Sequence, residues 1–338
     1  MFIVIEGTDA SGKSTLVSEV QKQLTERFPK NEIEFYHKSK PEEMSRRWVL
    51  YDYVTSIEKA DWSQRIAVAD RWHWGEVTYA AVKRPETGTG DGYGLLGKAG
   101  WRWTELFLQS RGVAQFWLYQ PLDVITRRLS ARGDDYIQAH ELEQILGLYE
   151  LAAAHSAGLA GRLTPSPDSL DAVSHLASHV ISRAEIFDED AQALVKFPEY
   201  IGQRFPRVLL VGDTRNITKK YGEETILPFM PVDGNSGEFL LTALESDKWK
   251  TMGIVNINDM SSERFEDLWC TLRRPPIVAL GRLAEKGLIY ADIPSYLYSV
   301  TSHPQHVRRF LNSQKEEYGK AITRLIHTKD REDKWILR

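Results

Sequence analysis

A glycine-rich loop directly behind a short apolar strand is the feature that most restricts what this chain can fold into. Phe2 to Ile5 form an apolar run, and residues 7–14 then fit the pattern GxxxxGK followed by Ser or Thr at every fixed position. Glycines at the fixed positions let the backbone curl around nucleotide phosphates, the lysine reaches the outer phosphates, and the hydroxyl holds Mg²⁺. The helical sequence behind the loop would turn its positive end towards the same anion. We therefore expect an α/β fold that binds ATP and Mg²⁺.

The residues assigned to nucleotide binding are those of the loop and of the first helical turn. They are Gly7, Thr8, Asp9, Ala10, Ser11, Gly12, Lys13, Ser14 and Thr15. Within this set, Lys13 is a catalytic candidate because it would neutralise charge on the transferred group, and Ser14 is a candidate metal ligand.

Composition excludes some classes of protein. The chain has 338 residues, enough for about two domains, and is 42% hydrophobic and 27% charged, which is ordinary for a globular protein. Its net charge of −4 gives no overall basic field for nucleic acid, although a local basic groove is compatible with it. No apolar run approaches the length of a membrane span, so we expect a cytoplasmic protein, in the host cell if the source is viral.

Cys270 is the only cysteine, which rules out a disulfide within the chain and suits a reducing compartment. Its helical, apolar neighbourhood predicts a buried structural thiol.

Apolar strand-like runs alternate with helical stretches through residues 1–185, which predicts a parallel sheet flanked by helices. An acidic cluster at 185–190, followed by Pro198 and Pro206, predicts a linker over 186–205, and a second α/β domain is predicted over 206–330. The predicted strands cover 2–5, 33–36, 66–69, 115–119, 208–211, 252–257 and 276–280. Functional groups of such folds gather at the carboxyl ends of the strands.

Asp70 and Arg71 follow one of these predicted strands, at the edge of the sheet where the glycine-rich loop opens. The planar guanidinium of Arg71 can clamp a phosphate or orient an acceptor. Asp70 can bind Mg²⁺ or accept a proton. A structural ion pair is the default for an isolated Asp-Arg, but the position behind a phosphate-binding loop favours the catalytic interpretation.

A basic stretch later in the chain contains Arg127, Arg128 and Arg132. Arg128 and Arg132 share one helical face. Phosphoryl transfer needs extra cations over the transferred group, so we predict a phosphate-covering lid with Arg128 and Arg132 as catalytic residues. A solvated basic helix surface is the alternative.

Taken in this order, residues 1–185 resemble the thymidylate kinase family of P-loop kinases. The resemblance rests on residues 6–15, Asp70-Arg71-Trp72, the basic stretch and Tyr149. It implies that Asp9 contacts the acceptor sugar and that Asp70 and Arg71 approach the acceptor phosphate.

The sequence departs from the family on the acceptor side. After the second strand the family usually has an Arg/Glu-Pro-Gly-type loop, whereas here residues 37–42 run from His37 to Glu42 and include Lys38 and Lys40. The helix after Trp72 differs as well. The donor side therefore matches while the acceptor side is remodelled, and Lys38 and Lys40 are candidate contacts to DNA or to a free phosphate.

The second half resembles, more loosely, the uracil-DNA glycosylase superfamily. The pieces are Gly212-Asp213, Pro228-Phe229 with Ser236-Gly237, Leu280-Gly281 and His303-Pro304. This resemblance implies a glycosylase-like domain in which Asp213 positions water and His303 contacts a flipped nucleotide. Thr214 and its neighbours stand where the superfamily has proline, which argues against base excision more than against a DNA- or base-reading surface. An unrelated α/β domain is the alternative.

Together the two resemblances imply a kinase whose acceptor lies within DNA. Bacteriophages that hypermodify thymidine use a branch of the thymidylate kinase family which this chain resembles, and which phosphorylates the hydroxymethyl group of 5-hydroxymethyluracil in the polymer. A hydroxyl acceptor benefits from a base, for which Asp9 is the first candidate and Asp70 the second. The acceptor base would have to flip out of the duplex. Four tryptophans are either stacking partners for it or core: Trp72, Trp74, Trp101 and Trp103.

Three other functions stay open from the sequence. In a deoxynucleoside monophosphate kinase, Lys38, Lys40 and Arg71 would grip a free 5′-phosphate. A DNA glycosylase with a regulatory P-loop domain would depend on Asp213, and a nucleotide-gated DNA-binding module would not turn over. The expected partner is DNA with modified thymidine or a free deoxynucleoside monophosphate, without a membrane, and the kinase resemblance implies a homodimer.

Overall fold

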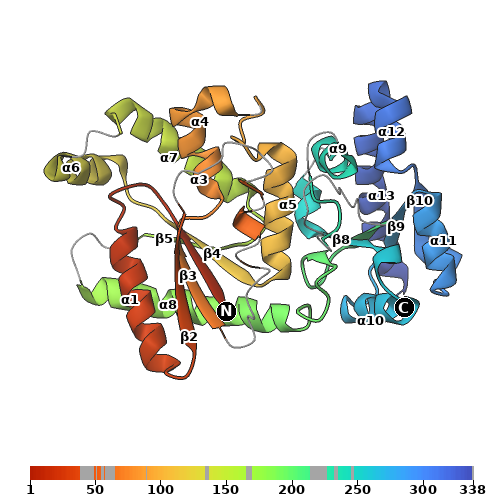
Figure 1. The fold of residues 1–338 in the computed structure, drawn as a ribbon, viewed down its shortest axis with the longest axis horizontal. Coiled ribbons are helices and arrows are strands. Elements are labelled where there is room, and N and C mark those ends of the chain that lie inside the picture. The colour runs from red at the N-terminus through yellow and green to blue at the C-terminus, as the bar shows by residue number, and fades with distance from the viewer. Residues whose placement is uncertain are drawn as a thin grey trace. The chain divides into compact units, whose positions relative to one another are not determined.

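A computed structural model of the chain describes residues 1–38, 49–50, 52–54, 57, 65–88, 90–133, 137–164, 170–213, 227–231, 235–244 and 247–336. The chain forms two compact units, each with a five-stranded sheet (Figure 1). Unit 1 comprises Met1–Gly97 and Gly112–Asp190, and unit 2 comprises Lys98–Arg111 and Ala191–Arg338.

The sheet of unit 1 is parallel throughout, in the order β2-β3-β1-β4-β5. Its strands are β1 (Phe2–Glu6), β2 (Glu32–His37), β3 (Arg65–Asp70), β4 (Val113–Leu118) and β5 (Leu159–Leu163). The four predicted strands of this sheet are confirmed. The sequence of β5 escapes prediction because a glycine and an exposed arginine interrupt its apolar residues. The central position of β1 puts the glycine-rich loop in the middle of the carboxyl edge.

One face of this sheet is covered by α1 (Lys13–Arg27) and α8 (Leu170–Gln192), which pack Leu16, Val20 and Ile181 against apolar side chains of β1, β3 and β4. The unit also contains the described helices α3 (Trp74–Val77), α4 (Tyr79–Lys83), η1 (Pro85–Thr87), α6 (Leu122–Arg132) and α7 (Ala139–His155). This arrangement confirms the predicted parallel sheet flanked by helices.

The sheet of unit 2 has the order β10-β9-β7-β8-β6. Its strands are β6 (Ile201–Gly202), β7 (Val208–Gly212), β8 (Met252–Asn256), β9 (Ile277–Leu280) and β10 (Tyr298–Thr301). Only β6 is antiparallel, and it lies at one edge. The chain passes from β7 to β8 on one side and then to β9 on the other, so β7 and β9 meet at a topological switch point, where ligands bind in sheets of this kind.

The core of unit 2 joins β7, β8 and β9 to α10 (Ser262–Thr271) and α11 (Arg282–Tyr290). The unit also contains the described elements α5 (Gly97–Ser110), α9 (Ser236–Ala243), η3 (Asp247–Thr251), η4 (Ile257–Asp259), η5 (Ser295–Leu297), α12 (Pro304–Phe310), η6 (Asn312–Gln314) and α13 (Lys315–Ile336).

Helix α5 belongs to unit 2 although it lies in the first third of the sequence. Arg102 Nη1 donates to Leu241 O and Leu244 O, both at 2.6 Å, and Trp103 Nε1 donates to Pro228 O at 2.9 Å. The predicted ranges 1–185, 186–205 and 206–330 follow the chain in a single pass and do not contain this insertion. Residues 186–205 hold the end of α8 and the strand β6 rather than linker alone.

Two expectations about side chains are settled by burial. The four tryptophans at 72, 74, 101 and 103 are each at most 1% exposed, so they are core and cannot stack on a flipped base. Cys270 is exposed, which contradicts the predicted buried thiol, because α10 turns Phe265 and Leu268 into the core instead. In the part of the chain that the structure describes, no helix is long and apolar enough to cross a bilayer.

Candidate active site

The glycine-rich loop joins β1 to α1 in a conformation that only glycine adopts easily. Gly12 has a φ of 96°, in the left-handed region. A Cβ added to Gly7 would lie 2.6 Å from Leu118 O, so a side chain does not fit there. The Tyr149 hydroxyl donates to Gly7 O at 3.1 Å and fixes the loop from α7. The loop therefore needs glycine at both fixed positions.

A cavity of about 180 Å³ opens over this loop. It is lined by residues 9–10 and 12–15 of the loop and by His37, Asp70, Arg71 and Arg132. The carboxyl ends of β1, β2 and β3 and the end of α6 therefore meet in one place. His37 is absent from the sequence-based assignment, although its position at the end of an apolar strand is a signal that could have found it.

Lys13 is a buried cation beside this cavity. Its Nζ donates to Thr8 O at 2.7 Å, and Ser11 Oγ donates to the same oxygen at 2.8 Å. Burial, reinforced by the positive charge of Arg71, lowers the pKa of Lys13 to about 8, while nearby carboxylates oppose the shift. The ammonium therefore lies at the cavity, where phosphate charge would compensate it.

This pKa gives a pH dependence with a defined sign. Because the Lys13 pKa falls from 10.5 to about 8, the free protein loses this charge as pH rises through about 8, so kcat/KM for ATP should decline above that pH. The folded state should gain stability over the same interval, since the unfolded chain still binds the proton that the folded chain has released. Initial rates and thermal unfolding across this pH range measure both. A kcat/KM that stays flat across this range would contradict the assignment.

The side chain of Arg71 is held by an ion pair with Asp9, by the ring of Tyr79 and by the conformation of its own backbone. Arg71 has a φ of 67° directly after β3, a rare conformation for a residue with a side chain. Its Nη2 pairs with Asp9 Oδ1, and its guanidinium lies 4.6 Å from the ring centre of Tyr79. The Tyr79 hydroxyl accepts from Asp9 N at 2.7 Å. Burial alone would lower the Arg71 pKa, but Tyr149, Tyr79 and Asp9 raise it above its ordinary value, so the charge is permanent.

The donors at the cavity fit Mg²⁺. Asp70 is 7% exposed, and its Oδ1 has no hydrogen-bond partner among the described residues. Its Oδ2 lies 3.6 Å from His37 Nδ1, and Ser14 lines the same cavity. Mg²⁺ typically takes one or two protein oxygens and completes its shell with phosphate and water, so Ser14 and Asp70 suffice. No cluster of three metal-binding side chains occurs in the described ranges.

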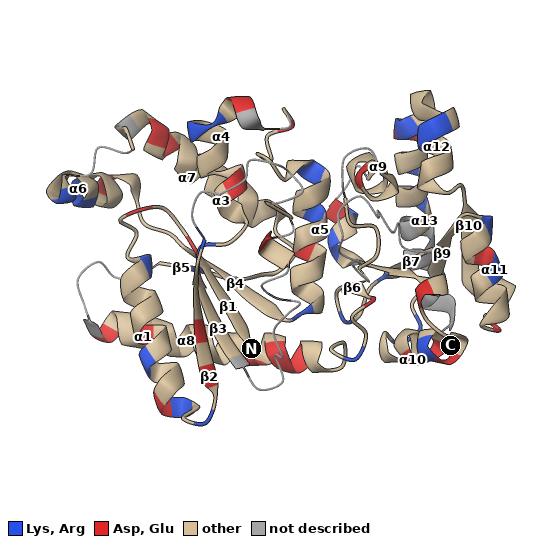
Figure 2. Cartoon of the chain, in the orientation of Figure 1, with Lys and Arg blue, Asp and Glu red and all other residues tan. Residues whose placement is uncertain are grey.

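Helix α6 supplies the cations of the predicted lid (Figure 2). Arg128 Nη1 donates to Ala10 O at 3.1 Å, and Arg128 and Arg132 both line a second cavity of about 410 Å³. Arg127 is exposed and lines neither cavity. The larger cavity has apolar walls from Val173 and Leu176 of α8, which suit a nucleotide base. Sequence reading missed these walls because they lie about 160 residues after the loop.

The candidate contacts of the acceptor side have different positions. Lys38 Nζ pairs with Asp52 at 2.7 Å and lies 4.9 Å from the ring centre of Trp72. The structure therefore pairs Lys38 with a partly exposed carboxylate and does not bring it to the cavity. Lys40 lies outside the described residues.

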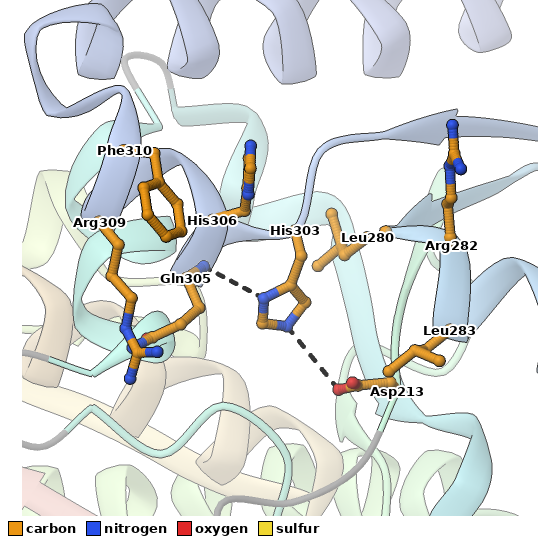
Figure 3. Close-up of a pocket in the computed structure, with 10 residues that line it drawn as sticks. Asp213, Leu280, Arg282, Leu283, His303, Gln305, His306, Arg309 and Phe310 are labelled. Atoms are coloured by element: carbon orange, nitrogen blue, oxygen red, sulfur yellow. Dashed lines mark hydrogen bonds and ion pairs between the residues drawn. The ribbon is translucent and has the colours of Figure 1, made fainter.

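Unit 2 has its own cavity, of about 320 Å³, at the switch point of its sheet (Figure 3). Asp213 follows β7, Gly281 follows β9 and His303 precedes α12. His303 Nδ1 accepts from Gln305 N at 3.1 Å, so the neutral ring carries its proton on Nε2, 3.7 Å from Asp213 Oδ1. Burial lowers the pKa of His303 against the opposing charge of Asp213. The two predicted residues of unit 2 therefore lie together, while Thr214 is outside the described part.

Two further residues stand near this edge of the sheet. Asn256 ends β8 and is 2% exposed, and its Oδ1 has no partner among the residues that the structure describes. The ring centre of Phe229 lies 6.4 Å from that of His303. The sequence signal for Asn256 is a polar residue at the carboxyl end of an apolar strand.

The comparisons with known proteins give only distant likenesses. No protein-family model matches the sequence, and none of the curated proteins matches it. Among solved structures, the YorR protein of Bacillus subtilis in complex with phosphorylated GDP is similar at 21% identity and a TM-score of 0.41, over 55% of this chain and 96% of that chain. Polyphosphate kinase 2 of Arthrobacter aurescens is similar at 15% identity and a TM-score of 0.38, over 55% of this chain and 66% of that one.

Deoxyadenosine kinase of M. mycoides is similar at 16% identity and a TM-score of 0.35, over 54% of this chain and 100% of that chain. All three TM-scores are below 0.5, so function is inferred from the fold and the site geometry of this chain alone.

Proposed function

We propose that this chain is an ATP-dependent phosphotransferase, an enzyme that uses Mg²⁺. The observation that carries this proposal is one cavity in which the loop residues Lys13 and Ser14 meet Asp70, Arg71 and Arg132. Ser14 and Asp70 would hold Mg²⁺, which neutralises phosphate charge when bound. Lys13 and Arg132 would stabilise the charge of the phosphoryl group in flight, and the α8 side of the larger cavity would hold the base.

The proposed acceptor is the hydroxymethyl group of 5-hydroxymethyluracil within DNA. A hydroxyl must lose its proton as it attacks, and the carboxylates of Asp9 and Asp70 both line the cavity. In this step the acceptor oxygen gives its proton to Asp9 and bonds to the γ-phosphorus. The bond from that phosphorus to its bridging oxygen breaks, and ADP leaves with the electron pair. Asp70 is the second candidate for the base.

Unit 2 supports a polymer acceptor through its surface chemistry. Large apolar side chains are exposed at Leu283, Ile289, Tyr290, Tyr296, Val300 and Phe310. Arg282 and Lys286 precede Tyr290 by eight and four residues on one face of α11, and Arg309 stands beside Phe310 at the cavity. Exposed aromatic rings among cations suit the stacking and phosphate contacts of an unpaired strand.

The test is a transfer assay with γ-labelled ATP and Mg²⁺. Duplex DNA containing 5-hydroxymethyluracil and a panel of free deoxynucleoside monophosphates are offered in separate reactions. Unmodified duplex DNA is the control. We expect label in the modified DNA that survives digestion as a phosphomethyl nucleoside. Label only in monophosphates would replace the proposed acceptor with a free nucleotide. Base release without transfer would instead favour a glycosylase.

A further inference from the structure

Glu6 is a buried carboxylate at the end of β1 that the proposed chemistry does not use. Its side chain is fully buried, and its Oε1 accepts from Trp72 N at 2.8 Å and from Trp74 N at 3.2 Å. Its Oε2 has no hydrogen-bond partner among the described residues. Burial raises the pKa of Glu6, although His73 and the two backbone donors oppose the shift. Burying a carboxyl group this deeply costs folding free energy unless hydrogen bonds compensate it.

The neighbours of Glu6 form the turn that aims Arg71. The β1–β3 pairing ends at Asp70, and Arg71 N still donates to Ile5 O at 3.0 Å. Arg71 then takes a left-handed conformation, which is unfavourable for a residue with a side chain. Trp72 and Trp74, next in the chain, are buried, and without Glu6 their backbone amides would lose the hydrogen bonds to its Oε1. The turn is therefore held by the backbone of β1 on one side and by Glu6 on the other.

We propose that Glu6 is a positioning residue for Arg71, acting through the backbone of the turn after β3. The inference rests on the proposed phosphotransferase function and deepens it. The Arg71 guanidinium reaches Asp9 and the cavity only because the strained turn directs it there. Glu6 supplies no proton and touches no reacting group in this scheme. Its effect on transfer is expected to pass through Arg71.

A double-mutant cycle between Glu6 and Arg71 tests this role. Glu6→Gln keeps an oxygen that can accept both backbone bonds, and should retain kcat within about threefold. Glu6→Ala removes the acceptor and should lower kcat by about 10²-fold, the cost of misplacing a catalytic group by about 1 Å. When Arg71→Ala is already present, adding Glu6→Ala should lower kcat by a further factor of less than about three, because the guanidinium that Glu6 positions is gone. ATP affinity should stay within about threefold throughout.

Two outcomes would overturn the inference. If the fold-losses of kcat of the two single variants multiply in the double variant, Glu6 does not act through Arg71. If Glu6→Ala lowers ATP affinity as much as it lowers kcat, Glu6 acts on the glycine-rich loop. Glu6→Asp, too short to reach both donors, replaces Glu6→Ala if the alanine variant fails to fold. The cycle is also run on the slow transfer of phosphate from ATP to water. If the wild-type protein transfers phosphate to neither DNA nor monophosphates, the proposed acceptors are wrong. The cycle measured with water as the acceptor still tests the role of Glu6.

Discussion

Replacing Lys13 with alanine is expected to lower phosphoryl transfer by about 10²–10³-fold, the usual cost of removing one preorganised charge from the transition state. Lys13 is 6% exposed and lines the cavity beside Ser14 and Asp70. No other ammonium group lines this cavity within the described ranges, so a replacement for the lost charge is not at hand. Steady-state kinetics with labelled ATP at saturating acceptor measure the effect.

Removing the charge of Lys13 should leave the fold intact. Burial already lowers the pKa of Lys13, which shows that its charge is unfavourable in the folded protein. Thermal unfolding of Lys13→Met at neutral pH should therefore occur at the wild-type temperature or above it. Lys22→Ala, an exposed change on the same helix, is the matched control and should alter neither property. Transfer that survives in Lys13→Ala at nearly the wild-type rate would remove the loop from the donor site.

Asp9→Asn is expected to lower kcat for a hydroxyl acceptor by about 10²–10⁴-fold, the range of general-base catalysis. The amide keeps an oxygen for the bond from Arg71 but no longer takes a proton, so the local geometry is preserved while the base is lost. ATP affinity should change little. The measurement is kcat on DNA containing 5-hydroxymethyluracil, with ATP affinity determined in parallel.

Asp70→Asn is the matched comparison for this prediction. Its main effect should be a higher Mg²⁺ requirement, because Asp70 has an unpartnered oxygen at the cavity. A large loss of kcat in Asp70→Asn at saturating Mg²⁺, with a small loss in Asp9→Asn, would transfer the role of base to Asp70. A free monophosphate acceptor is already ionised, so its phosphorylation should be insensitive to Asp9→Asn.

Much of the fold could be predicted from local sequence because the central strands are buried on both faces. Such strands are continuous apolar runs, and β1, β4 and β7 are buried along their whole length. The strands β5 and β10 lie at sheet edges and are only partly buried, so their sequences lack that signal. Membership of α5 in unit 2 was not predictable, since an apolar helix face does not state which core it fills.

The site shows the same division between local and distant information. The loop motif and Asp70-Arg71 are contiguous patterns whose chemistry depends on spacing, and the structure gathers them at one cavity. The partner of Lys38 is Asp52, fourteen residues away, and no local rule links the two. From the sequence, Lys38 is therefore predicted to be an unpaired cation, whereas in the structure it pairs with Asp52.

The discontinuous second unit has a consequence for how the protein is made. Arg102 and Trp103 of the segment 98–111 are synthesised 125 to 142 residues before the carbonyl groups that they bind. During translation, α5 must therefore stay without its own core until the chain beyond residue 244 has left the ribosome, whereas unit 1 has all its residues once position 190 is reached. A gene fragment starting at residue 191 would encode a unit lacking one of its helices, so an isolated second unit has to carry residues 98–111 on a grafted linker.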